Sequence, residues 1–395
     1  MANLSSGVPC PRSKGLDVVR ATAILWVMIY HAMNFDLVPD PDHWFIAFGW
    51  MGVDLFFVLS GFLIAGQLIS PFAEGNSPDY RKFFVRRSLR TLPAYLAVVG
   101  IYALIPAAWE RPGMQPLWQF LTFTENLLYI ADAPKTFSHV WSLCVEEQFY
   151  LLLPAVVALV ALRPSSKKTC ALLLIFLVAG IVLRASLWLD QVALPHFELA
   201  GEPQDQRYME LIYYPTWSRL DGLLAGVALA LLKAFRPARW AAFTSRPNAL
   251  LAAGLVGLGG SMAFFETQIA RLAPAAFGFP LLSCSIALIV AAASSDRSLI
   301  SSRRVPGIQA LATGAYSLYL VHKMAFHAVI EFADKTGLSG YPRLALALAA
   351  GFLAGAALYW FVERPFLKLR DRLQGPSRSS IARNAALVSH GDATA

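Results

Sequence analysis

About ten apolar stretches, each long enough to cross a lipid bilayer, are the feature of this sequence that most limits its fold. Inside a bilayer every backbone polar group must be hydrogen-bonded within the protein, so such stretches fold as helices. Charged residues make up only 15% of the 395 residues, whereas soluble domains carry about a quarter. We therefore expect an all-α, polytopic membrane bundle. The predicted spans cover residues 16–36, 48–70, 93–109, 140–162, 170–190, 215–235, 248–266, 274–294, 310–332 and 343–363.

The distribution of Lys and Arg predicts how these spans are oriented. Of the 33 basic residues, 23 fall in the terminal segments and every second connection, and only 6 in the other connections. Short loops that are rich in Lys and Arg stay in the cytoplasm, so we expect both termini there, in a multi-pass protein of the inner or plasma membrane. The net charge of +8 then reflects topology, and we expect membrane lipids rather than nucleic acid as partners.

The chain is expected to form one membrane domain over residues 1–372. The remaining residues, 373–395, are rich in Ser, Arg and Ala and are predicted to be a disordered cytoplasmic tail. The four cysteines are scattered and show no metal-ligand spacing, so we expect neither a disulfide nor a metal site.

Ionisable side chains inside the predicted spans are the main functional signal, because a charge at membrane depth is costly and seldom persists without a role. Eleven residues separate Arg20 from His31, about three helical turns, so both project from one face of the first span. A neutral histidine in a low-dielectric site can accept a proton from a hydroxyl group. The alternative is a histidine that only bonds to a neighbouring helix.

Asp54 begins the second span at a depth similar to that of His31. A carboxylate beside an imidazole orients the ring and raises its basicity, although an aspartate near the interface can also cap a helix.

A second polar stripe opens the fourth span. Ser142, Glu146 and Tyr150 recur at intervals of four residues, and Glu147 lies beside them. One glutamate can act as general acid or base, or can accept hydrogen bonds from acceptor hydroxyls. Alternatively, either glutamate pairs with Arg184 or Arg219 and only holds the bundle together.

Arg86 and Arg90 lie one helical turn apart at the predicted cytoplasmic end of the third span. Such a pair can bind phosphates, although residue types alone favour simple positive-inside anchoring. The polar residues of spans six and nine can line a cavity or bond across helices; they include Arg219, Asp221 and His322.

Taken together, these segments resemble the acyltransferase-3 family of integral membrane O-acyltransferases, which modify surface glycans and related acceptors. GLDVVRATAILWVMIYHA is similar to the first-helix motif, with Arg20 and His31, and GVDLFFVLSGFLI to the second, with Asp54. VRRSLRTLPAY carries the motif of two arginines separated by three residues, and HVWSLCVEEQFYLLLP resembles the fourth-helix motif. SRLDGLLAG, AYSLYLVHK and FVERPF are similar to later signatures. One departure is Lys323, where a tryptophan is common.

The resemblance implies acyl-CoA as the donor, with no permanently bound cofactor, and a hydroxyl of a glycan, glycolipid or glycosylated small molecule as the acceptor. The acyl group is expected to be acetyl or another short chain. His31 is expected to act as general base or to carry the acyl group, with Asp54, Glu146 and Glu147 as further catalytic candidates. Arg20, Arg86 and Arg90 would bind the donor. The acceptor would contact Trp141, Ser142, Tyr150, Arg219, Asp221 and His322.

Some family members carry a C-terminal extracytoplasmic esterase-like domain, for which the residues after the last span are too few. The alternative function is a proton-coupled transporter, or an exporter of acylated sugars, in which the His and Glu residues form a relay.

Overall fold

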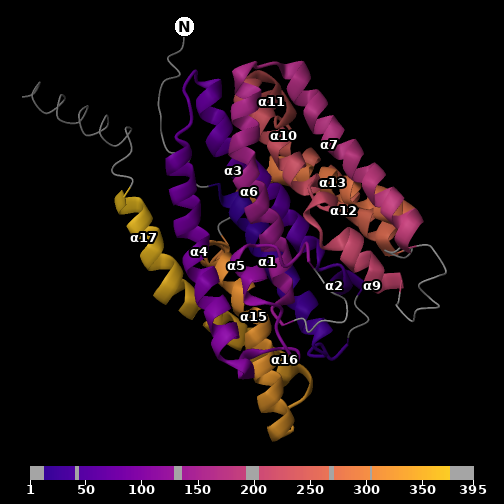
Figure 1. The fold of residues 1–395 in the computed structure, drawn as a ribbon, viewed down its shortest axis with the longest axis vertical. Coiled ribbons are helices and arrows are strands. Elements are labelled where there is room, and N and C mark those ends of the chain that lie inside the picture. Colours follow the sequence, from indigo (N-terminus) through magenta and orange to yellow (C-terminus); the bar gives the residue numbers. More distant parts are fainter. Residues whose placement is uncertain are drawn as a thin grey trace, which may run out of the picture.

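The computed structural model describes residues 13–40, 44–128, 136–192, 204–266, 271–302 and 305–373, and within these ranges it is helical with no strand (Figure 1). The predicted tail over 373–395 lies outside them, apart from Leu373. The α-helices are α1 (Lys14–Asn34), α2 (Trp44–Ala47), α3 (Met51–Ala73), α4 (Tyr80–Leu104), α5 (Leu117–Leu121), α6 (Trp141–Leu162), α7 (Ser166–Leu187), α9 (Gln204–Tyr208), α10 (Asp221–Phe235), α11 (Pro237–Phe243), α12 (Pro247–Glu266), α13 (Phe279–Ala293), α14 (Leu299–Ser302), α15 (Ile308–Thr336), α16 (Gly340–Leu358) and α17 (Arg364–Leu373).

Shorter 3₁₀ and π-helical turns connect or extend these helices. The 3₁₀ turns are η1 (Pro106–Ala108), η2 (Ser138–Val140) and η5 (Thr216–Ser218). The π-helical segments are η3 (Trp188–Val192), η4 (Met209–Tyr213), η6 (Pro274–Gly278) and η7 (Tyr359–Glu363).

Seven helical segments among the described residues are long and apolar enough to cross a membrane. They are α1, α3, η2 with α6, α7 with the start of η3, α12, η6 with α13, and α16 through α17. The three other predicted spans also contain helices, namely α4, α10 and α15. However, α10 has only 15 residues, and α4 and α15 carry more polar side chains. An all-helical bundle is thus confirmed, whereas the count of ten and the side on which the termini lie stay predictions.

Glycines allow the central helices to approach closely. Gly222 and Gly226 of α10 face α3, and a Cβ atom at Gly226 would collide with the backbone of Val58 and Phe62. Gly61 of α3 meets the backbone of Leu223 in the same way. Small residues four positions apart are the usual device for close helix contacts in membranes. The α3–α10 pair therefore forms a rigid centre for the bundle, and α1 packs against both α3 and α15.

Helix α7 lies at the edge of the bundle (Figure 1). Its apolar side chains face outward, and the only buried residue on it is Arg184. The outward apolar face fits contact with lipid, and the single guanidinium attaches the helix to the rest of the protein.

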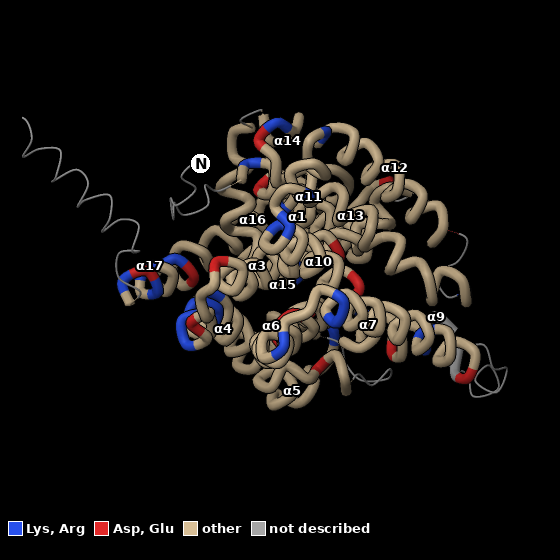
Figure 2. Tube along the Cα trace, turned by 90° about the horizontal axis from the view of Figure 1, so that it is seen from above, with Lys and Arg blue, Asp and Glu red and all other residues tan. Residues whose placement is uncertain are grey.

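The two ends of the bundle differ in charge. Ser13, before α1, donates a hydrogen bond to the carbonyl of Ala293 at 2.9 Å, so the start of α1 meets the end of α13. Both positions belong to segments that the Lys and Arg distribution assigns to one side. Viewed from above, Lys and Arg gather near the ends of α4, α14 and α17 (Figure 2). The start of α1 and the end of α13 thus lie at the same end of the bundle, and the side of the membrane that this end faces stays a prediction.

Candidate active site

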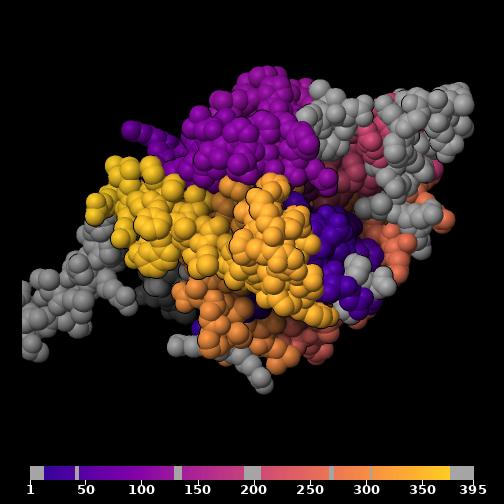
Figure 3. All heavy atoms as spheres, turned by 90° about the horizontal axis from the view of Figure 1, so that it is seen from below, coloured from indigo at the N-terminus to yellow at the C-terminus, as the bar shows by residue number. Residues whose placement is uncertain are grey.

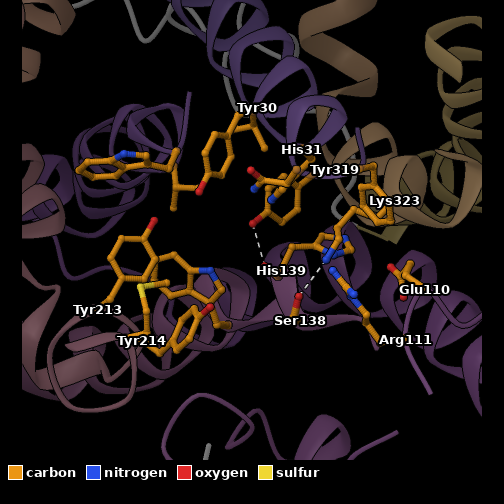
Figure 4. A pocket seen from close by; sticks show the side chains of 17 residues that line it. Tyr30, His31, Glu110, Arg111, Ser138, His139, Tyr213, Tyr214, Tyr319 and Lys323 are labelled. Carbon is orange, nitrogen blue, oxygen red and sulfur yellow. Dashed lines mark hydrogen bonds between the residues drawn. The ribbon is translucent and has the colours of Figure 1, made fainter. Parts of the chain in front are cut away.

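A cavity of about 250 Å³ opens at the opposite end of the bundle from Ser13. His31 lies 18 residues beyond Ser13, which is about 27 Å along a helix. Seen from below, residues from the first part of the chain, in indigo, lie beside the purple segment and the orange helices near the C-terminal end (Figure 3). The pocket is lined by Val27, Tyr30, His31, Asn34, Phe35, Trp50, Val53, Glu110, Arg111, Ser138, His139, Trp141, Met209, Tyr213, Tyr214, Tyr319 and Lys323 (Figure 4).

Three histidines from three different helical segments meet at this pocket. His31 comes from α1, His139 from η2 and His322 from α15. Nδ1 of His31 lies 2.7 Å from Nε2 of His322, and the two rings stack with centroids 4.9 Å apart. The ring of His139 lies 5.0 Å from that of His322 and 6.0 Å from that of His31. On α16, Gly351 leaves room beside the Cβ of His322.

The hydrogen bonds around His322 determine which nitrogen of each ring carries hydrogen. Nδ1 of His322 lies 2.8 Å from the carbonyl oxygen of Tyr319 and 3.1 Å from that of Leu318. Carbonyl oxygens only accept, so this Nδ1 donates, and in the neutral ring Nε2 is the acceptor. His31 therefore donates from Nδ1 and keeps a lone pair on Nε2, which has no hydrogen-bond partner among the described residues. His31 is thus arranged to accept a proton at Nε2.

Tyr319 connects this cluster to α6. Its hydroxyl donates to the carbonyl of His139 at 2.8 Å and lies 2.7 Å from Oγ of Ser142. Because the tyrosine hydrogen is used on the carbonyl, Ser142 donates to the tyrosine oxygen. Nδ1 of His139 is buried without a hydrogen-bond partner among the described residues.

A second polar cluster lies deeper in the bundle and is built on Glu146. Its carboxylate accepts hydrogen bonds from Ser60 at 3.0 Å and Tyr150 at 2.9 Å, and from Arg87 at 3.4 Å. Arg87 also donates to Glu147 at 3.0 Å, and its guanidinium lies 3.8 Å from the centroid of the Tyr150 ring. Both glutamates are therefore held by Arg87. The expected pairing with Arg184 or Arg219 is wrong, because those arginines bind other carboxylates.

The two predicted aspartates, Asp54 and Asp221, each form a buried ion pair with an arginine. Arg219 donates from Nη2 to both oxygens of Asp54, at 2.8 and 2.9 Å, with its guanidinium 4.0 Å from the centroid of the Phe279 ring. Arg184 binds both oxygens of Asp221, at 2.8 and 3.1 Å. Because both oxygens of each aspartate bind an arginine from another segment, these two carboxylates hold helices together.

These contacts correct the expectation that Asp54 or Glu146 orients His31. Asp54 is bound to Arg219 and Glu146 to Arg87, and the ring of His31 bonds instead to His322. Of the predicted acceptor contacts, Trp141 lines the pocket, and Ser142 and His322 lie directly behind it. Tyr150, Arg219 and Asp221 do not line it.

The predicted donor arginines lie towards the other end of the bundle. Arg86 is exposed and Arg90 partly buried on α4, and no carboxylate among the described residues lies within 4 Å of either. Arg20 contacts Asp17 at 3.6 Å. Neither Arg86 nor Arg90 is therefore in a direct ion pair with a described carboxylate, in contrast to Arg87 between them.

Sequence analysis missed three lining or supporting residues, namely Arg87, Arg111 and Glu110. Arg87 follows Arg86 directly and precedes Arg90 by three positions, and only helix packing decides which of these three arginines points inward. Glu110 and Arg111 lie in a loop with no periodic signal, where Glu110 accepts hydrogen bonds from the Tyr102 hydroxyl and the Phe137 amide.

The chain is similar in sequence to a known protein family. The family model described as "Acyltransferase domain" matches residues 13–361. The chain is 25% identical over 371 residues to the peptidoglycan O-acetyltransferase OatA of Listeria monocytogenes, covering 89% of this chain and 55% of that protein. It is 26% identical over 379 residues to the O-acetyltransferase OatA of Staphylococcus aureus, covering 90% and 57%.

A third relative, the putative peptidoglycan O-acetyltransferase YrhL of Bacillus subtilis, is 28% identical over 233 residues, covering 55% of this chain and 33% of that protein. The chain spans about half the length of the two OatA relatives. No solved structure matches it. The match to the family model covers all of the helices that build the pocket and the second polar cluster, and the chain therefore belongs to the acyltransferase family that this model describes.

Proposed function

We propose that the protein is a membrane O-acyltransferase that moves an acetyl or other short acyl group from acyl-CoA to a hydroxyl of a carbohydrate or glycosylated acceptor. The observation that carries this proposal is the unpartnered Nε2 of His31 facing a cavity large enough for a small acceptor group. Two of the relatives, from Listeria monocytogenes and Bacillus subtilis, carry peptidoglycan O-acetyltransferase in their names, which supports a glycan acceptor.

In this proposal the acceptor enters from the end of the bundle that carries few Lys and Arg, which is the extracytoplasmic side by the charge rule. Its hydroxyl hydrogen-bonds to Nε2 of His31. As the oxygen attacks the thioester carbonyl, its proton passes to Nε2. The C–S bond then breaks, and the CoA thiolate takes up a proton. In the alternative chemistry, Nε2 first carries the acyl group and then passes it to the acceptor.

His322 supports this step by its hydrogen bond to Nδ1 of His31. The bond holds the ring orientation and stabilises the positive charge that develops when Nε2 gains a proton. The donor would approach from the opposite end, where Arg86 and Arg90 bind the CoA phosphates and the pantetheine arm passes Arg20. The polar residues around Glu146 lie between these two ends.

The direct test uses purified protein in lipid nanodiscs with labelled acetyl-CoA and oligosaccharide acceptors, and detects the ester by mass spectrometry. The proposal predicts an acetylated saccharide and free CoA in equal amounts. Proton-dependent sugar uptake into liposomes without any thioester consumption would favour the transporter alternative instead.

A further inference from the structure

One side of the pocket contains more cationic than anionic side chains. Its charged lining residues are Lys323 and Arg111, which are cationic, and Glu110, besides the histidines. Glu110 already accepts hydrogen bonds on both oxygens, from Tyr102 at 2.7 Å and from the Phe137 amide at 3.1 Å. Its carboxylate is therefore held in the loop by these two bonds, and the two cationic lining residues outnumber this one negative charge.

Lys323 is the more informative of the two cations, because it is only 9% exposed. Its ammonium donates to the neutral hydroxyl of Ser138 at 2.8 Å and lies 5.7 Å from the centroid of the Phe35 ring. An ammonium has three hydrogens, and the described residues contain no carboxylate within 4 Å of it. A buried charge normally has a counter-ion in direct contact, whereas the carboxylates that act on Lys323, those of Glu110 and Glu125, lie beyond 4 Å. A buried lysine in the lining of a cavity without such a direct contact points to an anionic ligand.

Arg111 adds a second positive charge to the side of the pocket that contains Lys323. Its backbone is held to Thr136 by hydrogen bonds in both directions, at 3.3 and 3.0 Å, while its side chain is exposed at the pocket and forms no ion pair with the described residues. Figure 4 shows Lys323 and Arg111 on one side of the pocket and Tyr213 and Tyr214 on the other, with the histidines near the cations. Aromatic faces opposite a cationic wall suit a sugar ring that carries an acidic substituent.

We propose that Lys323 and Arg111 form an anion subsite, so that the acceptor is a saccharide carrying an ionised acidic group. This inference rests on the proposed acyl transfer and deepens it by naming the acceptor class. The acidic group binds the ammonium of Lys323 and the guanidinium of Arg111, and the ring lies against the tyrosines. A hydroxyl of the same saccharide then reaches Nε2 of His31.

The test compares acceptors that differ only in charge. Methyl glucuronide is matched with its neutral carboxamide, and a sugar phosphate is matched with its neutral dimethyl triester. For the unaltered protein in nanodiscs with acetyl-CoA, kcat/KM should be on the order of 10- to 100-fold higher for one anionic acceptor than for its neutral counterpart. Which pair shows the larger preference identifies the group as carboxylate or phosphate.

The variant Lys323→Met, which keeps the volume of the side chain, should lose this preference, because its rate falls more on the anionic acceptor than on the neutral one. Lys323→Arg should retain most of it. The matched control is Lys335→Met on the same helix, where the lysine is 77% exposed in an ion pair with Glu331, and it should behave as the unaltered protein.

Two results would overturn the anion subsite. One is equal transfer to charged and neutral acceptors by the unaltered protein. The other is a Lys323→Met variant that loses the same factor on both, which would mean that the lysine stabilises the reacting acyl group. Calorimetric binding of the same acceptors without donor separates this inference from the proposed function. Preferential binding of the anion without any transfer would contradict acyl transfer alone, whereas transfer without any charge preference would contradict the subsite alone.

Discussion

His31 and His322 are 291 residues apart in the sequence, yet Nδ1 of the first lies 2.7 Å from Nε2 of the second. Backbone carbonyls of Leu318 and Tyr319 accept from Nδ1 of His322 and so fix the direction of this bond. The pair places a lone pair on Nε2 of His31 towards the pocket. A histidine here fills the role that a carboxylate commonly has beside a catalytic imidazole.

The role of His322 can be separated from simple packing. His322→Gln retains an oxygen that can accept from Nδ1 of His31, whereas His322→Leu removes the acceptor. We expect the leucine variant to lose about 10²-fold in kcat with little change in KM, and the glutamine variant to recover part of that loss. The matched control is His327→Gln on the same helix. A leucine variant that keeps the parent kcat would exclude a positioning role.

The arginines of α4 are expected to bind the donor phosphates. Arg86→Ala should weaken binding of CoA by about 1.5–3 kcal/mol, because one charge-assisted contact is lost. Arg81→Ala, an exposed change one turn earlier on the same helix, is the control and should have little effect. Titration calorimetry with CoA measures both. Equal affinities for CoA in the two variants would mean that Arg86 does not bind the donor and only anchors the helix on the cytoplasmic side.

Asp54 is expected to stabilise the protein through Arg219 rather than to take part in proton transfer. Asp54→Asn leaves a buried guanidinium without its counter-ion and should cost about 3–5 kcal/mol of stability. Asp334→Asn removes an ion pair with Arg343 in which the aspartate side chain is 65% exposed, and should cost under about 1 kcal/mol. Thermal unfolding in detergent compares them, and similar Tm values for the two variants would contradict the assignment.

The orientation of the bundle follows from the Lys and Arg distribution. In a cysteine-free background, a membrane-impermeant thiol reagent should label Ala107→Cys, which lies in η1 after α4, in intact cells. Ser165→Cys, before α7, should be labelled only after the membrane is opened. Labelling of residue 165 in intact cells, with protection of residue 107, would reverse the topology and move the pocket to the cytoplasmic side.

Sequence periodicity was sufficient to predict the helices and several of the side chains that lie at the pocket or in the second polar cluster, because a helix displays its motif locally. Arg20 and His31 share a face of one helix, and Ser142, Glu146 and Tyr150 share a face of another. The partners could not be predicted in this way, since they come from packing between distant segments. His322 rather than Asp54 reaches His31, and Arg87 rather than Arg184 or Arg219 reaches the glutamates. Adjacent helical residues differ in direction by about 100°, so the inward arginine depends on how α4 is rotated.

The central claim is that Nε2 of His31 receives the proton of the acceptor hydroxyl, and a single-turnover assay of His31→Gln tests it most directly. Glutamine keeps a hydrogen-bonding side chain but cannot act as a base, so membrane insertion and CoA binding should survive. The rate of acyl transfer to the saccharide should fall on the order of 10²–10⁴-fold. A folded His31→Gln protein that acylates the saccharide at the parent rate would contradict the account, and would leave His139 or Glu146 as the base.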